Sequence, residues 1–182
     1  MQQTPDHIID FWFSARTRPL WFKSTPEFDQ ELMARFEGLY QQARQGGLDT
    51  WEETPIGALA LVIILDQFPL NMYRDQASSF SAEGMAREVA RRLLDRDGDQ
   101  GLTDEQKAFL YLPFMHSERL EDQDRSVELY EATGLEDNLR FARHHREIVR
   151  RFGRFPHRNA ILGRESSPEE LAYLASGKAF TG

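Results

Sequence analysis

The chain of 182 residues contains no cysteine. This absence excludes disulfide bonds, thiolate metal sites and cysteine nucleophiles, and it fits a reducing compartment. The N-terminal residues lack the basic and apolar regions of a signal peptide, and the longest apolar run, Ala58 to Leu65, is too short to cross a bilayer. We therefore expect a cytoplasmic protein without a membrane segment.

The common signatures of enzymes are also missing. The sequence has no Gly-x-Gly-x-x-Gly, Walker loop, Gly-x-Ser-x-Gly or His-Glu-x-x-His motif. Its five histidines form neither a His-x-x-x-His nor a Glu-x-x-His pair. We expect no intrinsic metal and no cofactor, and the motifs leave open whether the protein is an enzyme.

Positive charge is concentrated in one stretch. The net charge is −8, yet Arg140 to Arg164 holds eight arginines and one acid, which makes this window +7 and the remainder −15. Such an acidic remainder repels phosphates and argues against binding to nucleic acid or to an anionic membrane. We expect the positive charge of Arg140 to Arg164 to be balanced by the protein's own carboxylates, by a small anion, or by both.

Aromatic residues within this window favour partial burial. Phe152 and Phe155 favour the interior and carry the neighbouring arginines inward with them. Arginine is suited to planar, bidentate pairing with carboxylate or phosphate. The segment from Arg150 to Arg164 therefore predicts a rigid, partly buried cationic site.

The rest of the pattern is helical, and 40% hydrophobic residues suffice for one domain over residues 1–182. Threonine-proline pairs predict helix starts before Pro5, Pro26 and Pro55, and the third helix, to about Phe68, is apolar all round and central. Further helices are predicted from Ser79 or Ser81 to Asp97, from Asp104 to a break at Pro113, and over 122–132, 135–152 and 168–175. The sequence thus predicts an all-α fold of about eight helices with short connections around a buried central helix.

Asp66 lies near the end of the apolar helix, where burial and the helix dipole both disfavour its charge. It needs a cation, and Arg74, Arg154 and Arg158 are the candidates. The carboxylate is then half of a structural ion pair, or it orients a ligand or acts in catalysis.

The histidines give a second set of candidates. His145 falls in the middle of the apolar face that Leu135, Leu139, Phe141, Ala142, Ile148, Val149 and Phe152 form. It is a core imidazole or, less simply, a metal ligand. His116 and Glu118 follow the break at Pro113, where they could orient each other or a substrate, or satisfy the freed carbonyl groups.

Several long blocks resemble a known family. They are Trp51-Glu-Glu-Thr-Pro-Ile-Gly-Ala-Leu-Ala-Leu61, Leu65-Asp-Gln-Phe-Pro69, Tyr111-Leu-Pro-Phe-Met-His-Ser-Glu118 and Arg151-Phe-Gly-Arg-Phe-Pro-His-Arg-Asn159. The chain resembles the uncharacterised bacterial family called domain of unknown function 924 from Ile9 to its C-terminus. The resemblance implies a TPR-like superhelix of antiparallel helix pairs and no established reaction. Leu70 stands where that family usually has arginine.

The resemblance also carries a set of residues over by motif. They are Asp66, Gln67, Asn71, Arg74, His116, Glu118, Gln123, His145, Arg151, Arg154, His157, Arg158 and Asn159. Apart from Glu118 and Gln123, we take these as the ligand-binding candidates. The catalytic candidates are His116, Glu118, Asp66 and His157.

Three functions compete for these residues. In the first, Arg151, Arg154 and Arg158 grip a small carboxylate or phosphate metabolite in a polar pocket, while Asp66, His116 and Asn159 read its other groups. The second is an enzyme in which His116 or His157 moves a proton with Glu118 or Asp66 as partner. The third is a TPR-like module whose groove binds a protein partner. We favour the first and expect Asp66, His116 and the 154–159 loop to line one cavity supported by His145.

Overall fold

The computed structural model describes residues 3–176, and those residues contain helices and no strand. The predicted all-α class is therefore confirmed. The chain divides into two compact units: unit 1 is Met1–Arg74 with Ser78–Pro113, and unit 2 is Asp75–Ala77 with Phe114–Gly182. The single domain and the TPR-like superhelix expected from the sequence stay predictions.

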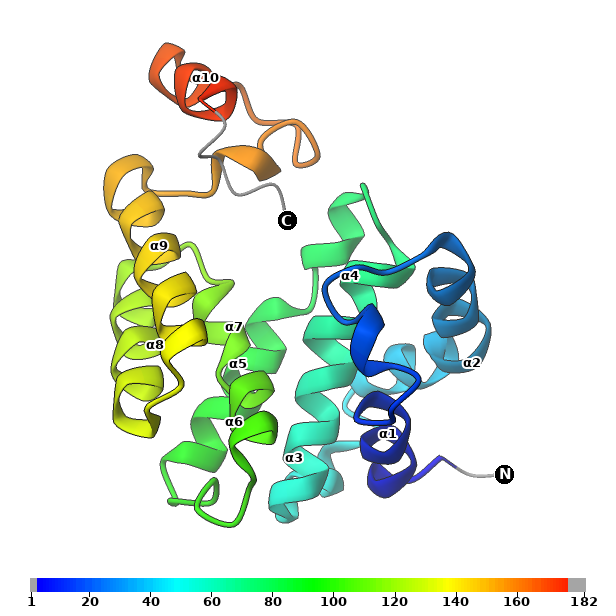
Figure 1. Cartoon of the computed structure of the whole chain (residues 1–182). Helices are drawn as coiled ribbons and strands as arrows, with labels where there is room; N and C mark the ends of the chain where they lie inside the picture. Colours follow the sequence, from blue (N-terminus) through cyan, green and yellow to red (C-terminus); the bar gives the residue numbers. More distant parts are fainter. Residues whose placement is uncertain (1–2, 177–182) are drawn as a thin grey trace. The chain divides into compact units, whose positions relative to one another are not determined.

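Unit 1 contains most of the helices. They are α1 (Pro5–Trp12), α2 (Pro26–Arg44), α3 (Pro55–Val62), α4 (Phe68–Met72), α5 (Glu83–Leu94), α6 (Asp104–Leu110) and the start of α7 (Leu112–Met115). Helix α3 packs against α1 on one side and against α5 and α6 on another (Figure 1). The predicted central helix is confirmed, because Leu59, Ala60 and Ile63 are all fully buried.

The predicted helix starts are confirmed where a side chain caps them. Thr4, Thr25 and Thr54 each precede a proline and accept a hydrogen bond from the backbone N–H three residues on. Thr103 and Gln106 form the expected capping box of α6. By contrast, α5 begins at Glu83 without a side-chain cap rather than after Ser79 or Ser81.

The central helix extends further than the sequence indicated. A π-helical turn, Ile63–Gln67, joins α3 to α4, so the helical segment runs from Pro55 to Met72 and not to Phe68. The wide turn, in which the Phe68 N–H bonds the Ile63 carbonyl, changes the backbone just before Pro69, which has no N–H and would strain a regular α-helix. The segment is long and apolar enough to cross a membrane, but 83% of it is buried inside the protein, as in a core helix.

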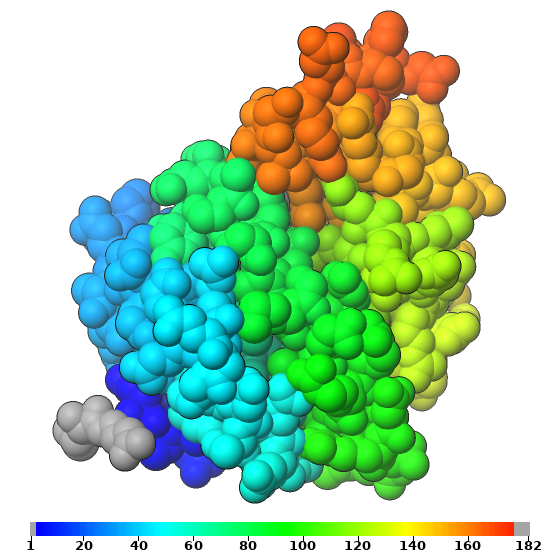
Figure 2. Space-filling view, turned by 180° about the vertical axis from the view of Figure 1, so that it is seen from behind, coloured from blue at the N-terminus to red at the C-terminus, as the bar shows by residue number. Residues whose placement is uncertain are grey.

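Aromatic rings fill the space beside this helix. Trp12 and Phe36 contact Phe68 with ring centroids 5.6 and 4.8 Å apart, and Trp12 meets Phe109 edge to face. At the other end of the unit, Arg92 at the end of α5 pairs with Glu52 just before α3. Figure 2 shows these cyan and green segments side by side.

Unit 2 is built on an antiparallel pair, α8 (Leu120–Thr133) and α9 (Glu136–Phe152), followed by a 3₁₀ turn (Pro156–Arg158) and α10 (Pro168–Ala175). Gly134 and Gly153 end the two long helices with φ of 69° and 70°, the left-handed conformation that glycine adopts readily. Ser167 and Glu170 form a capping box at α10.

The inner face of α9 is largely as predicted. His145 is 4% exposed, and Leu139, Ala142, Ile148 and Val149 are buried with it. Phe141 was wrongly assigned to this face, because it is 45% exposed and lies beneath the Arg140 guanidinium, 5.4 Å from its ring centroid. An aromatic ring at the edge of the face is covered by a long cationic side chain instead of by the core.

Candidate functional site

Several arginines of the basic window pair with carboxylates of unit 2. The pairs are Arg140–Asp137, Arg143–Glu131, Arg146–Asp124, Arg150–Glu147, Arg154–Glu170 and Arg164–Glu118. Arg151 and Arg158 stack on Phe152 and Phe155, with the guanidinium carbon 4.5 and 4.8 Å from the ring centroid. Most of the positive charge therefore organises unit 2 itself.

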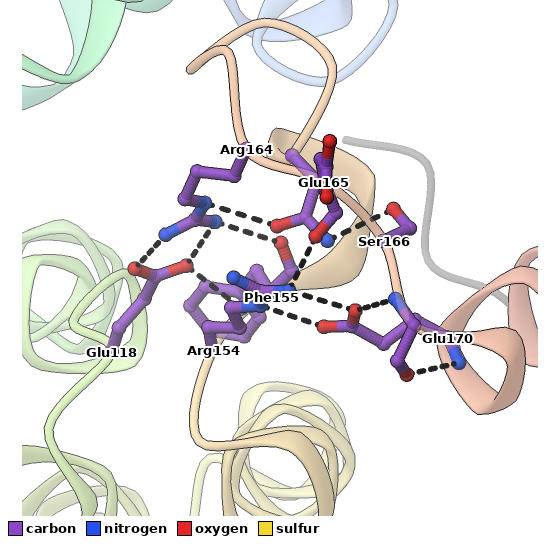
Figure 3. Close-up of polar contacts among 9 residues, drawn as sticks. Glu118, Arg154, Phe155, Arg164, Glu165, Ser166 and Glu170 are labelled. Carbon is purple, nitrogen blue, oxygen red and sulfur yellow. Dashed lines mark hydrogen bonds and ion pairs between the residues drawn. The ribbon is translucent and has the colours of Figure 1, made fainter.

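Arg154 fastens α10 to the end of α9. Its Nε and Nη2 donate to the two carboxylate oxygens of Glu170 at 2.7 and 2.8 Å, and Nη2 also donates to the Glu165 carbonyl (Figure 3). These hydrogen bonds hold the pKa of Glu170 at about 2. Arg154 thus has a structural role, and its proposed role as an anion ligand stays a prediction.

Arg164 makes a second bidentate contact, with Glu118. Its Nη1 and Nη2 donate at 2.7 and 2.9 Å, and the backbone N–H of Phe155 donates to the same carboxylate at 2.8 Å (Figure 3). Burial alone would raise the pKa of Glu118, but these hydrogen bonds lower it below its usual range. Glu118 is therefore an ionised anchor for the 155–164 loop.

Asn159 completes this loop. It is 1% exposed, its Oδ1 accepts from Arg164 Nε at 3.0 Å, and its Nδ2 donates to Ser166 Oγ at 3.0 Å. Arg164 was not among the predicted site residues. Its place at the end of the basic window was the available signal, but its partner lies 46 positions away in the sequence.

Phe155, fully buried, is surrounded by imidazole and guanidinium groups. The rings of His145 and His157 lie 5.5 and 5.6 Å from its ring, and the Arg158 guanidinium lies over it. We call Glu118, His145, Phe155, His157, Arg158 and Arg164 the Phe155 cluster.

The histidines of this cluster are neutral at physiological pH. Burial lowers the pKa of His145 to about 3, and burial together with the charge of Arg158 lowers the pKa of His157 to about 4. His116 is close enough to act on both through its charge. The structure thus brings His116, His145, His157, Arg158 and Glu118 into one neighbourhood.

The hydrogen bond of His145 fixes its tautomer. Nδ1 lies 2.8 Å from the Phe141 carbonyl oxygen, which can only accept. Nδ1 therefore carries the proton of the neutral ring, and Nε2 is left as a hydrogen-bond acceptor.

Gln123 satisfies the backbone freed at the Pro113 break. Its Nε2 donates to the Met115 and Ser117 carbonyls at 2.7 and 2.6 Å. Ser117 in turn donates to Asp122 at 2.6 Å. This matches the interpretation in which polar residues near the break satisfy freed carbonyls.

Unit 1 holds the remaining candidates in a chain of hydrogen bonds on the π-helical turn. Asp66, 1% exposed, accepts from Gln67 Nε2 at 2.5 Å, and Asn71 Nδ2 donates to the Gln67 carbonyl at 3.0 Å. Arg74 donates to Asn71 Oδ1 at 3.1 Å and pairs with Asp29 at 2.8 Å. The chain therefore runs from a half-exposed arginine to a buried carboxylate.

Two expectations about Asp66 remain untested by these contacts. They are its pairing with an arginine and its convergence with His116 and the 154–159 loop in one cavity. π-helical turns occur often at functional sites, so the position of Asp66 agrees with its candidacy. Within residues 3–176, no three His, Asp or Glu side chains are placed to hold a metal ion.

The chain is similar to known proteins over nearly its whole length. The model of a family described as bacterial protein of unknown function (DUF924) matches residues 8–178. The solved structure of the protein of unknown function ATU0120 from Agrobacterium tumefaciens is similar, with 40% sequence identity and a TM-score of 0.89 over 95% of this chain and 97% of that one. No curated protein matches the chain.

Proposed function

The chain belongs to the bacterial family DUF924, and we propose from its own residues that unit 2 binds a small carboxylate or phosphate anion at the Phe155 cluster. Arg158 carries the proposal. It is 6% exposed, and Phe155 holds its guanidinium in place from one face. A guanidinium fixed in this way loses little conformational freedom when it binds a planar anion.

The electrostatics of the cluster support this choice. Burial is the first cause of the lowered pKa of His157 and the charge of Arg158 is the second, while Glu118 acts in the opposite direction and Arg164 adds a smaller effect in the same direction as Arg158. An anion bound there meets the guanidinium of Arg158 and imidazoles that are neutral, so the imidazoles can hydrogen-bond without adding charge.

The exposed arginines of α9 support a local anion site rather than a nucleic-acid surface. Arg140, Arg143 and Arg150 already pair with carboxylates on α8 or α9. With a net charge of −8, a long polyanion gains little from this face.

Thermal shift and calorimetry with inorganic phosphate and citrate test the proposal. A ligand at a hundredfold excess over its dissociation constant stabilises the folded state by about 2.7 kcal/mol. Arg158→Gln should abolish this stabilisation. Arg151→Gln makes the same change in charge at an exposed arginine that also stacks on a phenylalanine, and it should leave the stabilisation intact.

The same measurements can also contradict the proposal. If Arg158→Gln lowers the melting temperature and neither phosphate nor citrate stabilises the wild-type protein, the cluster is structural. If both variants weaken binding equally, the anion responds to overall charge and not to the cluster.

One observation bears on the alternative hypothesis that the protein is an enzyme. His157 is neutral at physiological pH, so its imidazole can hydrogen-bond to a bound substrate, although burial and the charge of Arg158, which lower its pKa to about 4, make it a weak base. Glu118 is bound by Arg164 and Phe155 and so acts as an anchor of the loop rather than as an acid. A cytoplasmic location belongs to the same proposal, since a chain without cysteine suits a reducing compartment.

A further inference from the structure

The loop that carries Arg158 is held at both of its ends by one carboxylate. At the start of the loop, the backbone N–H of Phe155 donates to Glu118 Oε1 at 2.8 Å. At its end, the guanidinium of Arg164 donates to both oxygens of Glu118, at 2.7 and 2.9 Å (Figure 3). Glu118 comes from the turn before α8, outside the loop. A single side chain therefore closes the segment 155–164 onto this turn.

Hydrogen bonds inside the loop link its two ends directly. Arg164 Nη2 donates to the Phe155 carbonyl oxygen at 3.3 Å, and Arg164 Nε donates to Asn159 Oδ1 at 3.0 Å. The backbone N–H of Arg158 donates to the same Phe155 carbonyl oxygen at 3.1 Å. Glu118 thus orients the arginine that braces the loop from within.

The same contacts reach the guanidinium on which the proposed function depends. Glu118 accepts from the N–H of Phe155, and the ring of Phe155 supports the guanidinium of Arg158, whose carbon lies 4.8 Å from the ring centroid. A shift of the Phe155 backbone therefore moves the surface on which Arg158 stacks. This chain of contacts connects Glu118 to the anion site through the loop.

Glu118 acts on a bound anion in two opposite ways. Its negative charge repels the anion, but the side chains of Glu118 and Arg164 are 27% and 25% exposed, so solvent screens this repulsion. Its hydrogen bonds fix the loop before the anion arrives, which lowers the conformational entropy that binding must remove. Fixing even one backbone residue costs more free energy than a screened pair of charges gains, so the second effect should be the larger.

We propose that Glu118 is a positioning residue for the anion site, because it fixes the loop 155–164 at both ends and so holds Arg158 in the orientation that binds the anion. This inference rests on the proposed function. It predicts that removing the negative charge of Glu118 weakens the binding of an anion. Charge alone predicts the opposite change, so the direction of the effect distinguishes the two.

Calorimetric titration with inorganic phosphate tests the inference with two matched variants. Glu118→Gln keeps the size of the side chain and removes its charge. It should weaken phosphate binding about tenfold, the ratio that corresponds to fixing roughly one more backbone residue on binding. Glu147→Gln makes the same change in another bidentate pair, with Arg150 on α9, outside the loop. This control should not weaken phosphate binding.

Arg164→Lys tests the same anchor without changing the net charge. A lysine ammonium lacks the planar fork that meets both oxygens of Glu118 and the side chain of Asn159. Phosphate binding should therefore weaken although every charge is kept. Circular dichroism checks that each variant is folded, and Arg164→Lys decides the question if Glu118→Gln does not fold.

Hydrogen exchange separates positioning of the loop from a general loss of stability. The backbone N–H groups of Leu162 and Arg164 donate within the loop, to the carbonyls of Arg158 and Asn159 at 2.9 and 2.8 Å. In Glu118→Gln these amides should exchange faster than in the wild type and regain their protection when phosphate saturates the protein. The amides of α8 should exchange alike in the two proteins.

Two kinds of result would overturn the inference in distinguishable ways. If phosphate binds Glu118→Gln and Arg164→Lys as tightly as the wild type, or more tightly, the anion site stands and Glu118 does not position it. Unchanged protection of the loop amides in Glu118→Gln leads to the same conclusion. If phosphate does not bind the wild-type protein, the proposed function fails and the inference fails with it.

Discussion

Arg154 and Glu170 form a bidentate ion pair that joins the end of α9 to α10. Glu170 is also the third residue of α10, where it accepts from the backbone N–H of Ser167 at 2.7 Å. One carboxylate therefore caps a helix and anchors it. The arginine that the sequence suggested as a ligand contact is first a structural residue.

Replacing Glu170 by Gln should lower the stability of the protein. The change keeps the size of the side chain but removes the charge that strengthens the contact with Arg154, at a cost of about 2 kcal/mol. Thermal unfolding followed by circular dichroism measures the effect. Glu169→Gln, next to it and exposed, is the control and should change the melting temperature little. Equal effects of the two changes would contradict a special role for Glu170.

His145 should make the protein sensitive to mild acid. Its pKa is about 3 in the folded state, compared with 6.5 for an exposed histidine. Between pH 6.5 and pH 3 the unfolded chain therefore binds a proton at His145 that the folded protein does not bind. The contribution of His145 to the free energy of unfolding is fully present above pH 6.5 and is lost as the pH falls toward 3. The slope is about 1.4 kcal/mol per pH unit for one such group.

Urea unfolding between pH 7 and pH 4.5 measures this contribution. His145→Gln should show a shallower loss of stability than the wild type. His144→Gln changes the neighbouring, exposed histidine and should keep the wild-type slope. Identical slopes in all three proteins would show that His145 is not the buried neutral group.

Features of the fold that depend on local hydrogen bonds could be predicted from the sequence. The starts of α1, α2 and α3 could be predicted because Thr4, Thr25 and Thr54 each accept a hydrogen bond from a backbone N–H only three residues further along the chain. The π-helical turn could not, because its hydrogen-bond pattern competes closely with that of an α-helix in an apolar segment.

The site was predicted in type but not in pairing. Residue types between Arg150 and Arg164 indicated a partly buried cationic segment, and Arg158 and Asn159 are indeed buried. The partners of Arg154 and Arg164 lie 16 and 46 positions away, and no local pattern encodes such contacts.

Asp66 should be costly to remove. Asp66→Ala removes a buried carboxylate from the π-helical turn, where it accepts from Gln67, and we expect a loss on the order of 3–5 kcal/mol if Arg74, Arg154 or Arg158 is its further partner. Asp29→Ala breaks the half-exposed pair with Arg74 and should cost less than about 1 kcal/mol. Chemical denaturation compares the two. A loss for Asp66→Ala as small as that for Asp29→Ala would contradict the buried pair.

The most direct test of anion binding is a nuclear magnetic resonance titration of the histidine side chains with inorganic phosphate. Burial and, second, the charge of Arg158 lower the pKa of His157; phosphate at Arg158 offsets the second cause, so this pKa should rise above about 4 as the site fills. His144 lies on the exposed face of α9, and its ring signals serve as the internal reference. If phosphate saturates the protein while the pKa of His157 stays unchanged, or shifts both histidines alike, the anion does not bind at the Phe155 cluster.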